Sequence, residues 1–253
     1  MLNSHGESSE KREASQPPDW LKTISSDQQA CSYLPNEIAC LPFSYSAETV
    51  TGERLDWLLA AGYRRSGAYF YRTMCPVCSE CVPLRISVSN FHPNRSQKRA
   101  KVKGERLLKT ALSVPSVDTK RISLFNRHRQ QRGMAQSERD ITEEEYRDFL
   151  MQSPCETWEF SFSYGGQLVG ASITDVGSES LSAVYCYFDP DYEWLSLGTY
   201  SILMQVQIAQ QAGFRWLYLG YYVKDNSHLS YKANFGPHQR LLSGNWRDYV
   251  RGP

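Results

Sequence analysis

The order of hydrophobic patterns over residues 159–235 constrains the fold more than any other feature of this sequence. Apolar and aromatic residues alternate on both sides of Gly165 and Gly166, which is typical of a β-hairpin with a tight turn. Further along, Ser196 can cap a helix and Gly213 can end it, with apolar residues at helical spacing between them. The predicted elements are a hairpin over 159–173, strands over 181–190 and 215–223, and helices over 196–213 and 226–235. This order predicts a mixed α+β fold.

Hairpin, strand, helix, strand and short helix is also the order of the second half of the GNAT acyltransferase fold, which this part of the chain resembles. We therefore expect a GNAT-like transferase domain over residues 111–253. A smaller α/β N-terminal domain that carries a cysteine cluster is expected over residues 27–110. Residues 1–26 are polar, contain two prolines and lack the apolar segment of a secretion signal. They predict a disordered leader and a cytoplasmic protein.

Charge is balanced over the whole chain, with 28 Lys and Arg against 27 Asp and Glu, so only a local cluster could attract a polyanion. Residues 94–109 form such a cluster, with seven basic residues and one acid, Glu105. Like charges at this density repel each other unless an anion is near, which favours a helix that contacts phosphates. The alternative is a solvated helix face. Arg95, Lys98 and Arg99 are our candidates for phosphate contacts.

Three of the seven cysteines form the motif Cys-x-x-Cys-x-x-Cys at Cys75, Cys78 and Cys81. Thiolates at this spacing can ligate a metal ion or an iron–sulfur cluster. A fourth ligand would come from another segment, the options being Cys31, Cys40 and His92. The alternative is three partly buried thiols on a tight turn, because the second close pair that marks zinc sites is missing.

The stretch YLGYYVKDNSHLSYKANFGP, residues 218–237, places four tyrosines and a phenylalanine around two lysines. Its first half is predicted to be a strand whose tyrosines, including Tyr222, are divided between the core and a ligand site. Tyr231, Lys232 and Phe235 lie at positions i, i+1 and i+4 of the short helix. There an aromatic ring and a cation could hold an adenine ring and its phosphate.

The junction before the long helix is where GNAT enzymes carry a glycine-rich loop for the pyrophosphate of coenzyme A. This chain offers only Leu197, Gly198 and Thr199 there, so that phosphate cradle is missing. A helix N-terminus still attracts an anion through its free N–H groups. Ser196, Leu197, Gly198 and Tyr200 are therefore candidates for substrate contacts.

Six separated motifs occur in this order: CSYLP, YRTMCPVCSECVPLRI, SVSNFHPNRSQKRA, YFDPDYEWLSLGTYSILMQVQIA, LYLGYYV and SYKANFGP. Together they extend over most of the chain from Cys31 to about Leu242. They resemble the arginyl-tRNA–protein transferase family, and within it the short bacterial branch of aspartate/glutamate leucyltransferases.

The resemblance implies an aminoacyltransferase that moves leucine from Leu-tRNA to the α-amino group of proteins beginning with Asp or Glu, in the N-degron pathway of protein degradation. Its partners would be the charged tRNA and the acceptor protein, without a membrane. The chemistry would require no cofactor. Three alternatives stay open: arginyl transfer from Arg-tRNA, N-acetyl transfer from acetyl-CoA, and a non-catalytic RNA- or metal-binding module.

For this reaction, Asp189 could take a proton from the attacking amine or orient it, although a turn residue before Pro190 would explain it equally well. The other catalytic candidates are Tyr222, Tyr231 and Lys232. Tyr231 and Lys232 are expected to hold the 3′ end of the tRNA, because single-stranded ends are typically stacked on aromatic rings.

An acidic acceptor also needs a cation. Arginine is preferred because its planar fork matches a carboxylate in two places. Arg65, Arg72 and Arg85 lie beside the cysteine motif in the sequence and are the candidates. The alternative is that they are surface arginines.

Overall fold

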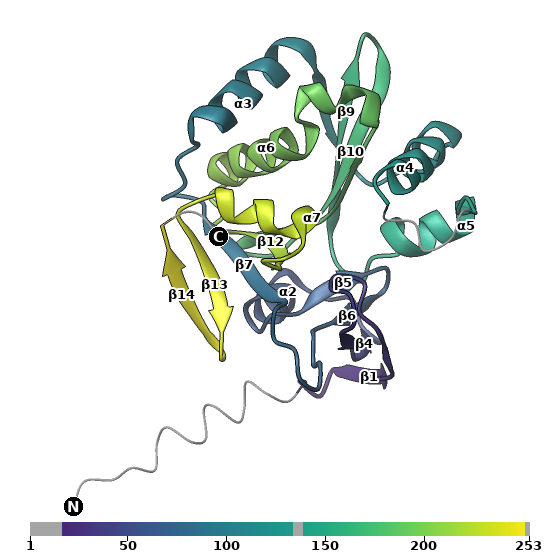
Figure 1. Ribbon diagram of the computed structural model, residues 1–253, viewed down its shortest axis with the longest axis vertical. Helices are drawn as coiled ribbons and strands as arrows, with labels where there is room; N and C mark the ends of the chain where they lie inside the picture. The colour runs from purple at the N-terminus through teal and green to yellow at the C-terminus, as the bar shows by residue number, and fades with distance from the viewer. Residues whose placement is uncertain (1–16, 134–138, 251–253) are drawn as a thin grey trace, which may run out of the picture.

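In the computed structural model of this chain, residues 17–133 and 139–250 are described (Figure 1). A sheet of eight strands forms the centre of the molecule, in the order β14-β13-β7-β12-β11-β10-β9-β8. The strands are β7 (Val82–Ser87), β8 (Lys109–Ser113), β9 (Thr157–Tyr164), β10 (Gln167–Val176), β11 (Ser180–Phe188), β12 (Trp216–Tyr222), β13 (His238–Leu242) and β14 (Asn245–Tyr249).

Strands β11 and β12 run parallel and pair only over residues 180–182 and 216–218. Beyond these residues β11 stays paired with β10, and β12 stays paired with β7, so the two strands separate. The next residues of β11, 183–186, are only half-buried although the strand lies within the sheet. We call residues 183–186 of β11 and 219–222 of β12 the β11–β12 fork. Residues 183–186 are partly exposed, whereas residues 219–222 are buried.

Helices cover both faces of the large sheet (Figure 1). On one side lie α3 (Arg95–Leu107) and α6 (Leu197–Ala212), and on the other lie α4 (Thr119–Gln131), α5 (Glu143–Tyr146) and η1 (Arg147–Met151). Helix α3 packs closely on α6 at Gly104. A Cβ atom at this position would lie only 2.3 Å from the ring of Tyr200, so the contact requires glycine. The chain enters α6 through η2 (Pro190–Leu195) and leaves β12 through α7 (Ser227–Ser230) and η3 (Tyr231–Asn234).

A smaller unit lies against one end of the large sheet. Its four-stranded sheet has the order β1-β4-β6-β5. The elements are β1 (Leu21–Ser25), β4 (Phe43–Ser46), β5 (Arg64–Ser66), β6 (Tyr69–Tyr71), the helix α2 (Gly52–Ala60) and the separate pair β2 (Gln28–Ala30) and β3 (Ile38–Cys40). Leu55 and Leu58 of α2 share a core cluster with Tyr218 of β12, so the two units are packed together.

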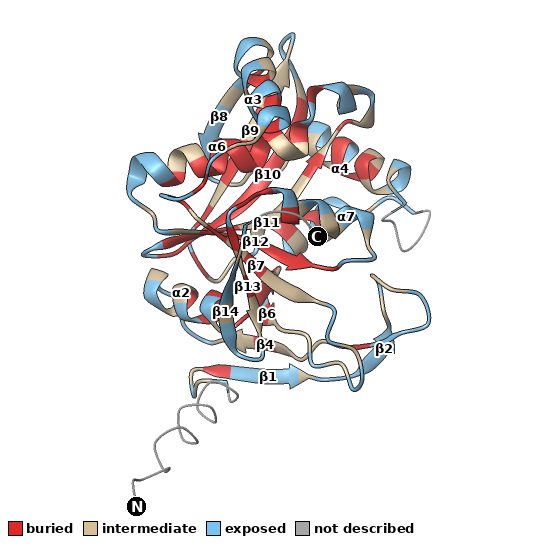
Figure 2. Ribbon diagram, turned by 60° about the vertical axis from the view of Figure 1, so that its left-hand side comes forward, coloured by how far each residue is buried: buried red, intermediate tan, exposed pale blue. Residues whose placement is uncertain are grey.

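The predicted α+β fold is confirmed. The hairpin, both strands and the long helix of the second half lie where the sequence places them, while residues 226–235 form α7 and η3 instead of one helix. Figure 2 shows buried residues concentrated along the central strands and α6, as the apolar patterns require.

The first half differs from the prediction at both ends. Residues 21–25 form β1 and pair with β4. The prediction of a disordered leader is therefore wrong for these residues, because pairing with β4 orders them. Residues 1–16 lie outside the described part. The large sheet also takes β7 and β8 from the predicted N-terminal domain, so the sheet continues across the boundary predicted at residue 110.

None of the helices in residues 17–133 and 139–250 combines the length and the apolar character that a bilayer span needs.

Candidate active site

Two cationic side chains meet at the β11–β12 fork. Arg64 comes from β5 and is 8% exposed; its Nη1 donates to Ser182 Oγ at 3.0 Å and its Nη2 to the carbonyl oxygen of Ala183 at 2.7 Å. Lys232 comes from η3, and its Nζ donates to the carbonyl oxygen of Tyr221 at 2.9 Å. Burial, and next the charge of Arg64, lower the pKa of Lys232 to about 7. The hydrogen bonds of both cations that the described residues show therefore go to neutral oxygen atoms.

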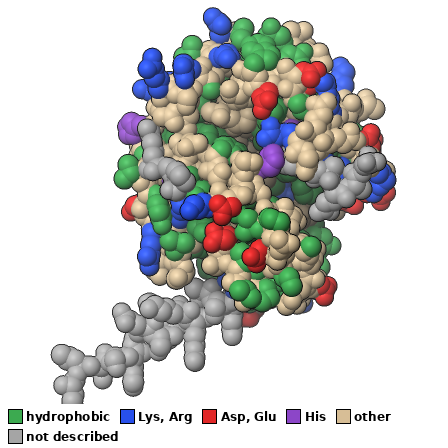
Figure 3. All heavy atoms as spheres, in the orientation of Figure 1, with side chains coloured by type: hydrophobic (Ala, Val, Ile, Leu, Met, Phe, Trp, Pro, Cys, Tyr) green, Lys and Arg blue, Asp and Glu red, His purple; other side chains and the backbone are tan. Residues whose placement is uncertain are grey.

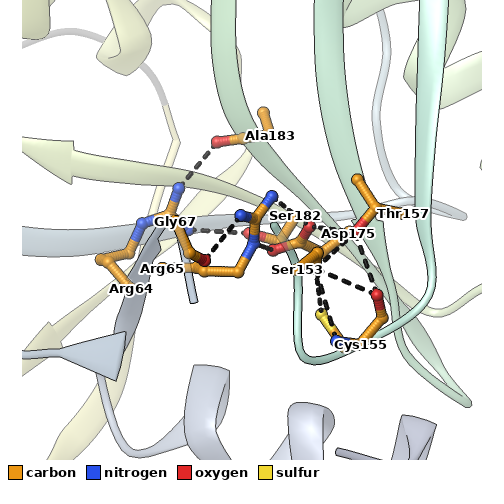
Figure 4. Close-up of polar contacts among 9 residues, drawn as sticks. All are labelled: Arg64, Arg65, Gly67, Ser153, Cys155, Thr157, Asp175, Ser182 and Ala183. Carbon is orange, nitrogen blue, oxygen red and sulfur yellow. Dashed lines mark hydrogen bonds and ion pairs between the residues drawn. The ribbon is translucent and has the colours of Figure 1, made fainter. Parts of the chain in front are cut away.

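Arg65, the next residue, points to a different partner (Figure 4). Its Nε and Nη2 donate to the two carboxylate oxygens of Asp175 at 2.8 and 2.9 Å, and both side chains are 1% exposed. Thr157 Oγ1 donates to the same carboxylate at 2.9 Å. This bidentate pair occupies the guanidinium of Arg65, so the prediction that Arg65 binds a substrate carboxylate is contradicted.

Three tyrosines from different elements surround the two cations. The hydroxyl of Tyr221 accepts a hydrogen bond from the backbone N–H of Thr73 at 3.3 Å, and its ring lies 6.2 Å from that of Tyr71. Tyr71 in turn shares a hydrogen bond with Tyr33 of the CSYLP motif. Burial raises the pKa of all three phenols, so they are neutral. They provide polar but uncharged walls.

Tyr231 is the aromatic side chain on the open side of this arrangement. The residue is 37% exposed, while its hydroxyl is buried, and this burial raises the pKa of the hydroxyl. Phe235 is different, because it is 1% exposed and stacks on Phe91 with 6.3 Å between ring centroids. Tyr231 is thus accessible to a stacking base, whereas the prediction for Phe235 is contradicted because this ring belongs to the core.

The other predicted arginines lie elsewhere. The guanidinium of Arg85 is sandwiched between the rings of Trp216 and Trp246, at 3.7 and 4.1 Å from their centroids. It also donates to the hydroxyl of Tyr218 at 3.0 Å. Arg72 lies 5.1 Å from the ring centroid of Tyr63. Arg85 therefore stabilises the contact between the large sheet and its edge hairpin, and a substrate role for these two arginines stays a prediction.

Two predicted catalytic residues are occupied by structural contacts. The carboxylate of Asp189 accepts from Arg127 Nη1 at 2.8 Å and from the backbone N–H of Asp191 at 3.0 Å, where it caps η2. Tyr222 is 5% exposed, with the guanidinium of Arg240 4.0 Å from its ring centroid. These contacts favour a structural role for Asp189 and for Tyr222. Both side chains are buried, so neither is open to an attacking amine.

The start of α6 also contains core residues. Leu197 and Tyr200 are 0% and 2% exposed, so their predicted substrate contacts are contradicted by burial in the core between α6 and β9. Ser196 is exposed, lies in the left-handed region at φ 55°, and its side chain accepts no capping hydrogen bond from the start of α6. A Cβ at Gly198 would lie 3.7 Å from the ring of Phe188. Contacts of Ser196 and Gly198 with substrate stay predictions.

Helix α3 carries the basic cluster on its solvent face. Asn94 and Gln97 form a capping box that starts the helix, while Arg95, Lys98 and Arg99 are exposed. Figure 3 shows a group of cationic side chains over this part of the molecule. None of these three has an acidic partner among the described residues, so their charges are available to a polyanion.

The cysteines of the motif lie near one another in the smaller unit. Burial raises the pKa of Cys81 to about 12, and the neighbouring Cys31, Cys75 and Cys78 add to this rise. Cys81 is therefore a neutral thiol. Among the described Cys, His, Asp and Glu side chains, no three are placed to hold a metal ion. A metal ion or iron–sulfur cluster at this motif stays a prediction.

Sequence reasoning missed Arg64, Tyr33 and Tyr71 as neighbours of Lys232. Tyr33 and Tyr71 lie within the motifs quoted above, and Arg64 lies seven residues before Tyr71. The available signal was the pair Arg64 and Arg65 on a short strand, since consecutive strand residues point to opposite sides and need different partners.

Comparison with known proteins bears on the fold and the family. The solved structure of FemX superposes with a TM-score of 0.51 at 8% sequence identity, covering 84% of this chain and 72% of that one, which shows the fold alone. The topology and this likeness show the GNAT-like fold that the sequence predicts.

The family follows from the sequence. Residues 29–99 match the model for the N terminus of arginine-tRNA-protein transferase, and residues 120–242 match the model for its C terminus. The chain belongs to this transferase family. It is 33% identical over 219 residues to the aspartate/glutamate leucyltransferase of Marinobacter nauticus, covering 86% of this chain and 92% of the relative. With the enzyme of the same name from Aeromonas hydrophila it is 35% identical over 235 residues, covering 92% and 97%.

Proposed function

We propose that this enzyme transfers leucine from Leu-tRNA to the α-amino group of proteins whose first residue is Asp or Glu. The observation that carries this proposal is the 33–35% identity, over nearly the full length of both chains, to relatives named aspartate/glutamate leucyltransferase. The product would begin with leucine. We assign the reaction to the cytoplasm, where charged tRNA is available.

The reaction needs positioning more than a strong base. The nitrogen of the acceptor attacks the ester carbonyl of the aminoacyl-tRNA, a C–N bond forms, and the C–O bond to the terminal ribose breaks. One proton leaves the amine, and one proton is taken up by the departing ribose oxygen. An α-amino group has a pKa of about 7.7–8.0, so roughly a tenth of it is neutral and nucleophilic near pH 7. Holding amine and ester in contact can then supply most of the rate.

The β11–β12 fork is suited to this task. Tyr231 is exposed beside it and can stack the terminal adenine of the tRNA. Residues 183–186 are half-buried where the strands separate, so the peptide can reach this part of β11. The exposed cations of α3 can bind phosphates of the tRNA body.

Arginyl transfer from Arg-tRNA is the second candidate, because the matching family models describe an arginine-tRNA-protein transferase. The donor amino acid differs between the two reactions, whereas the acceptor chemistry is the same.

One assay tests both. Purified protein is incubated with Leu-tRNA or Arg-tRNA and with peptides that begin with Asp, Glu or Ala, and products are identified by mass spectrometry. We expect leucine on the Asp and Glu peptides and no product with Ala. Arginine in place of leucine would select the second candidate, and the absence of any aminoacylated peptide would refute both.

A further inference from the structure

The two cations at the β11–β12 fork lack a counter-charge. Arg64 donates to a serine hydroxyl and a carbonyl oxygen, and Lys232 donates to a carbonyl oxygen. Neither side chain forms an ion pair with any Asp or Glu among the described residues. Burying a charge without a paired anion costs several kcal/mol, so such groups are rarely left alone in a folded protein.

The two cations contact successive residues of β12, Gly220 and Tyr221. The guanidinium of Arg64 packs on Gly220, where a Cβ atom would lie 3.1–3.3 Å from Nη2, Cζ and Nε. The ammonium of Lys232 is bonded to the carbonyl of the next residue, Tyr221. Gly220 has a φ of 84° and marks a shift in the pairing of β12 with β7, so the backbone is shaped to accommodate the guanidinium.

Free donors remain on both cations. An arginine has five N–H groups and a lysine ammonium has three. Hydrogen bonds to Ser182, Ala183 and Tyr221 use three of these eight donors. The surrounding phenols of Tyr33, Tyr71 and Tyr221 are neutral and supply no anion.

We propose that Arg64 and Lys232 form the binding site for the side-chain carboxylate of the acceptor's N-terminal Asp or Glu. The inference rests on the proposed function and adds the residues that select the acceptor. A carboxylate fits better than a phosphate of the tRNA, because the side chain of a terminal residue can enter a site where Arg64 is 8% exposed. The phosphates of RNA lie within a bulky backbone and suit the exposed cations of α3.

The site explains discrimination between acids and their amides. Asn and Gln have nearly the same shape as Asp and Glu but leave the buried Arg64 and the half-buried Lys232 unpaired. Leaving a buried charge without its partner typically lowers binding by on the order of 100-fold or more. The wild-type enzyme should therefore prefer Asp over Asn by at least about this factor.

The test compares Lys232→Met with wild type. Methionine keeps the length and apolar volume of the lysine stem and removes the charge. Lys224→Met is the matched control, since Lys224 is exposed eight residues earlier in the same segment. For each protein, kcat and KM are measured for peptides that differ only in beginning with Asp or Asn, and KM is measured for Leu-tRNA.

We expect Lys232→Met to raise the KM for the Asp peptide by about 100-fold and to leave the Asn peptide and Leu-tRNA within about threefold. Lys224→Met should behave like wild type. An unchanged Asp-to-Asn ratio in Lys232→Met would overturn the inference while leucyl transfer itself stands. Equal losses on both peptides with a raised KM for Leu-tRNA would assign these cations to RNA and also overturn it.

A second measurement uses the wild-type protein alone and does not depend on turnover or on the folding of a variant. Lysines are labelled with acetic anhydride, and the labelling rates of Lys232 and Lys224 are compared by mass spectrometry. A saturating Asp peptide should slow labelling of Lys232 several-fold relative to Lys224, and the Asn peptide should not. Equal labelling of Lys232 with both peptides contradicts the site, even if no transfer is detected.

Discussion

Arg64 and Arg65 are consecutive, equally buried arginines that face opposite situations. The Arg65–Asp175 pair, which we call the closed pair, is a cation with its own anion. Two hydrogen bonds join the guanidinium to the carboxylate, and Thr157 donates a third to the carboxylate. The Arg64–Lys232 pair is open, with two cations and only neutral acceptors. The closed pair joins the smaller unit to β10 and serves stability. The open pair stores an unsatisfied charge at the fork and serves binding.

The largest effect should come from opening the closed pair. Asp175→Asn removes the charge that Arg65 needs and leaves a buried, unpaired guanidinium. We expect the free energy of unfolding to fall by about 3–5 kcal/mol, measured by urea denaturation. Glu48→Gln is the control, because the Arg54–Glu48 pair has a distance of 2.7 Å but is exposed to solvent. Glu48→Gln should change the free energy of unfolding by less than about 1 kcal/mol. Equal losses in the two variants would show that the Arg65–Asp175 pair contributes no more to stability than an exposed ion pair.

Removing a charge from the open pair should have the opposite sign. We expect Lys232→Met to raise the free energy of unfolding by about 1–3 kcal/mol at pH 7, because an uncompensated buried cation is replaced by an apolar side chain. Activity on Asp peptides would fall in the same variant. A destabilised Lys232→Met protein would argue that Lys232 has a structural partner.

The same lysine predicts a dependence of stability on pH. The pKa of Lys232 is about 7 in the fold, where burial, Arg64 and the thiol of Cys81 act on it, and about 10.4 in an unfolded chain. Between these values the unfolded state binds more protons, so the contribution of Lys232 makes stability rise with pH. Denaturation across this range should show a smaller rise in Lys232→Met. Parallel curves for the two proteins would contradict the lowered pKa.

A smaller effect should separate backbone shape from contact with Arg64. Gly220 and Gly213 both have positive φ, at 84° and 79°, but only Gly220 has a neighbour where a Cβ would lie. Each change to alanine should cost about 1–2 kcal/mol from the backbone. Gly220→Ala should in addition displace Arg64 and weaken the preference for Asp over Asn, whereas Gly213→Ala should keep it. Identical preferences would remove Gly220 from the site.

The smallest effects are expected on α3, where the cations are exposed. Changing Arg95, Lys98 or Arg99 singly to glutamine should weaken Leu-tRNA binding modestly and reduce the slope of log K against log salt concentration by about one. The KM for the acceptor peptide should not change. Lys22→Gln, on the exposed strand β1, is the control. A salt dependence that stays the same in all three variants would place the tRNA elsewhere.

The sequence predicts local elements well and the site only in part. The hairpin around Gly165 and the helix ending at Gly213 follow from patterns a few residues long, so they are correct. Lys232 and Tyr231 were singled out because they are neighbours on one short segment. The partner Arg64 could not be predicted, because β5 and η3 are brought together only by the packing of the smaller unit on β12.

Burial was the other limit. Leu197, Tyr200 and Phe235 have the residue types of a ligand site but lie in the core, and a short pattern does not say which side of α6 or η3 is covered. The sequence does not distinguish Arg64 from Arg65 as a site for a substrate carboxylate, because both have the same side chain on the same strand. Only the position of Asp175 distinguishes them.

The most direct test of the Arg64–Lys232 carboxylate site is to measure the pKa of Lys232 by NMR titration of labelled lysine, with and without acceptor peptide. We predict a value of about 7 for the free protein and a clear increase with a peptide that begins with Asp, because a nearby carboxylate favours the charged ammonium. The matching Asn peptide should leave the value unchanged. A pKa that does not respond to the Asp peptide, or responds equally to both peptides, would contradict the account.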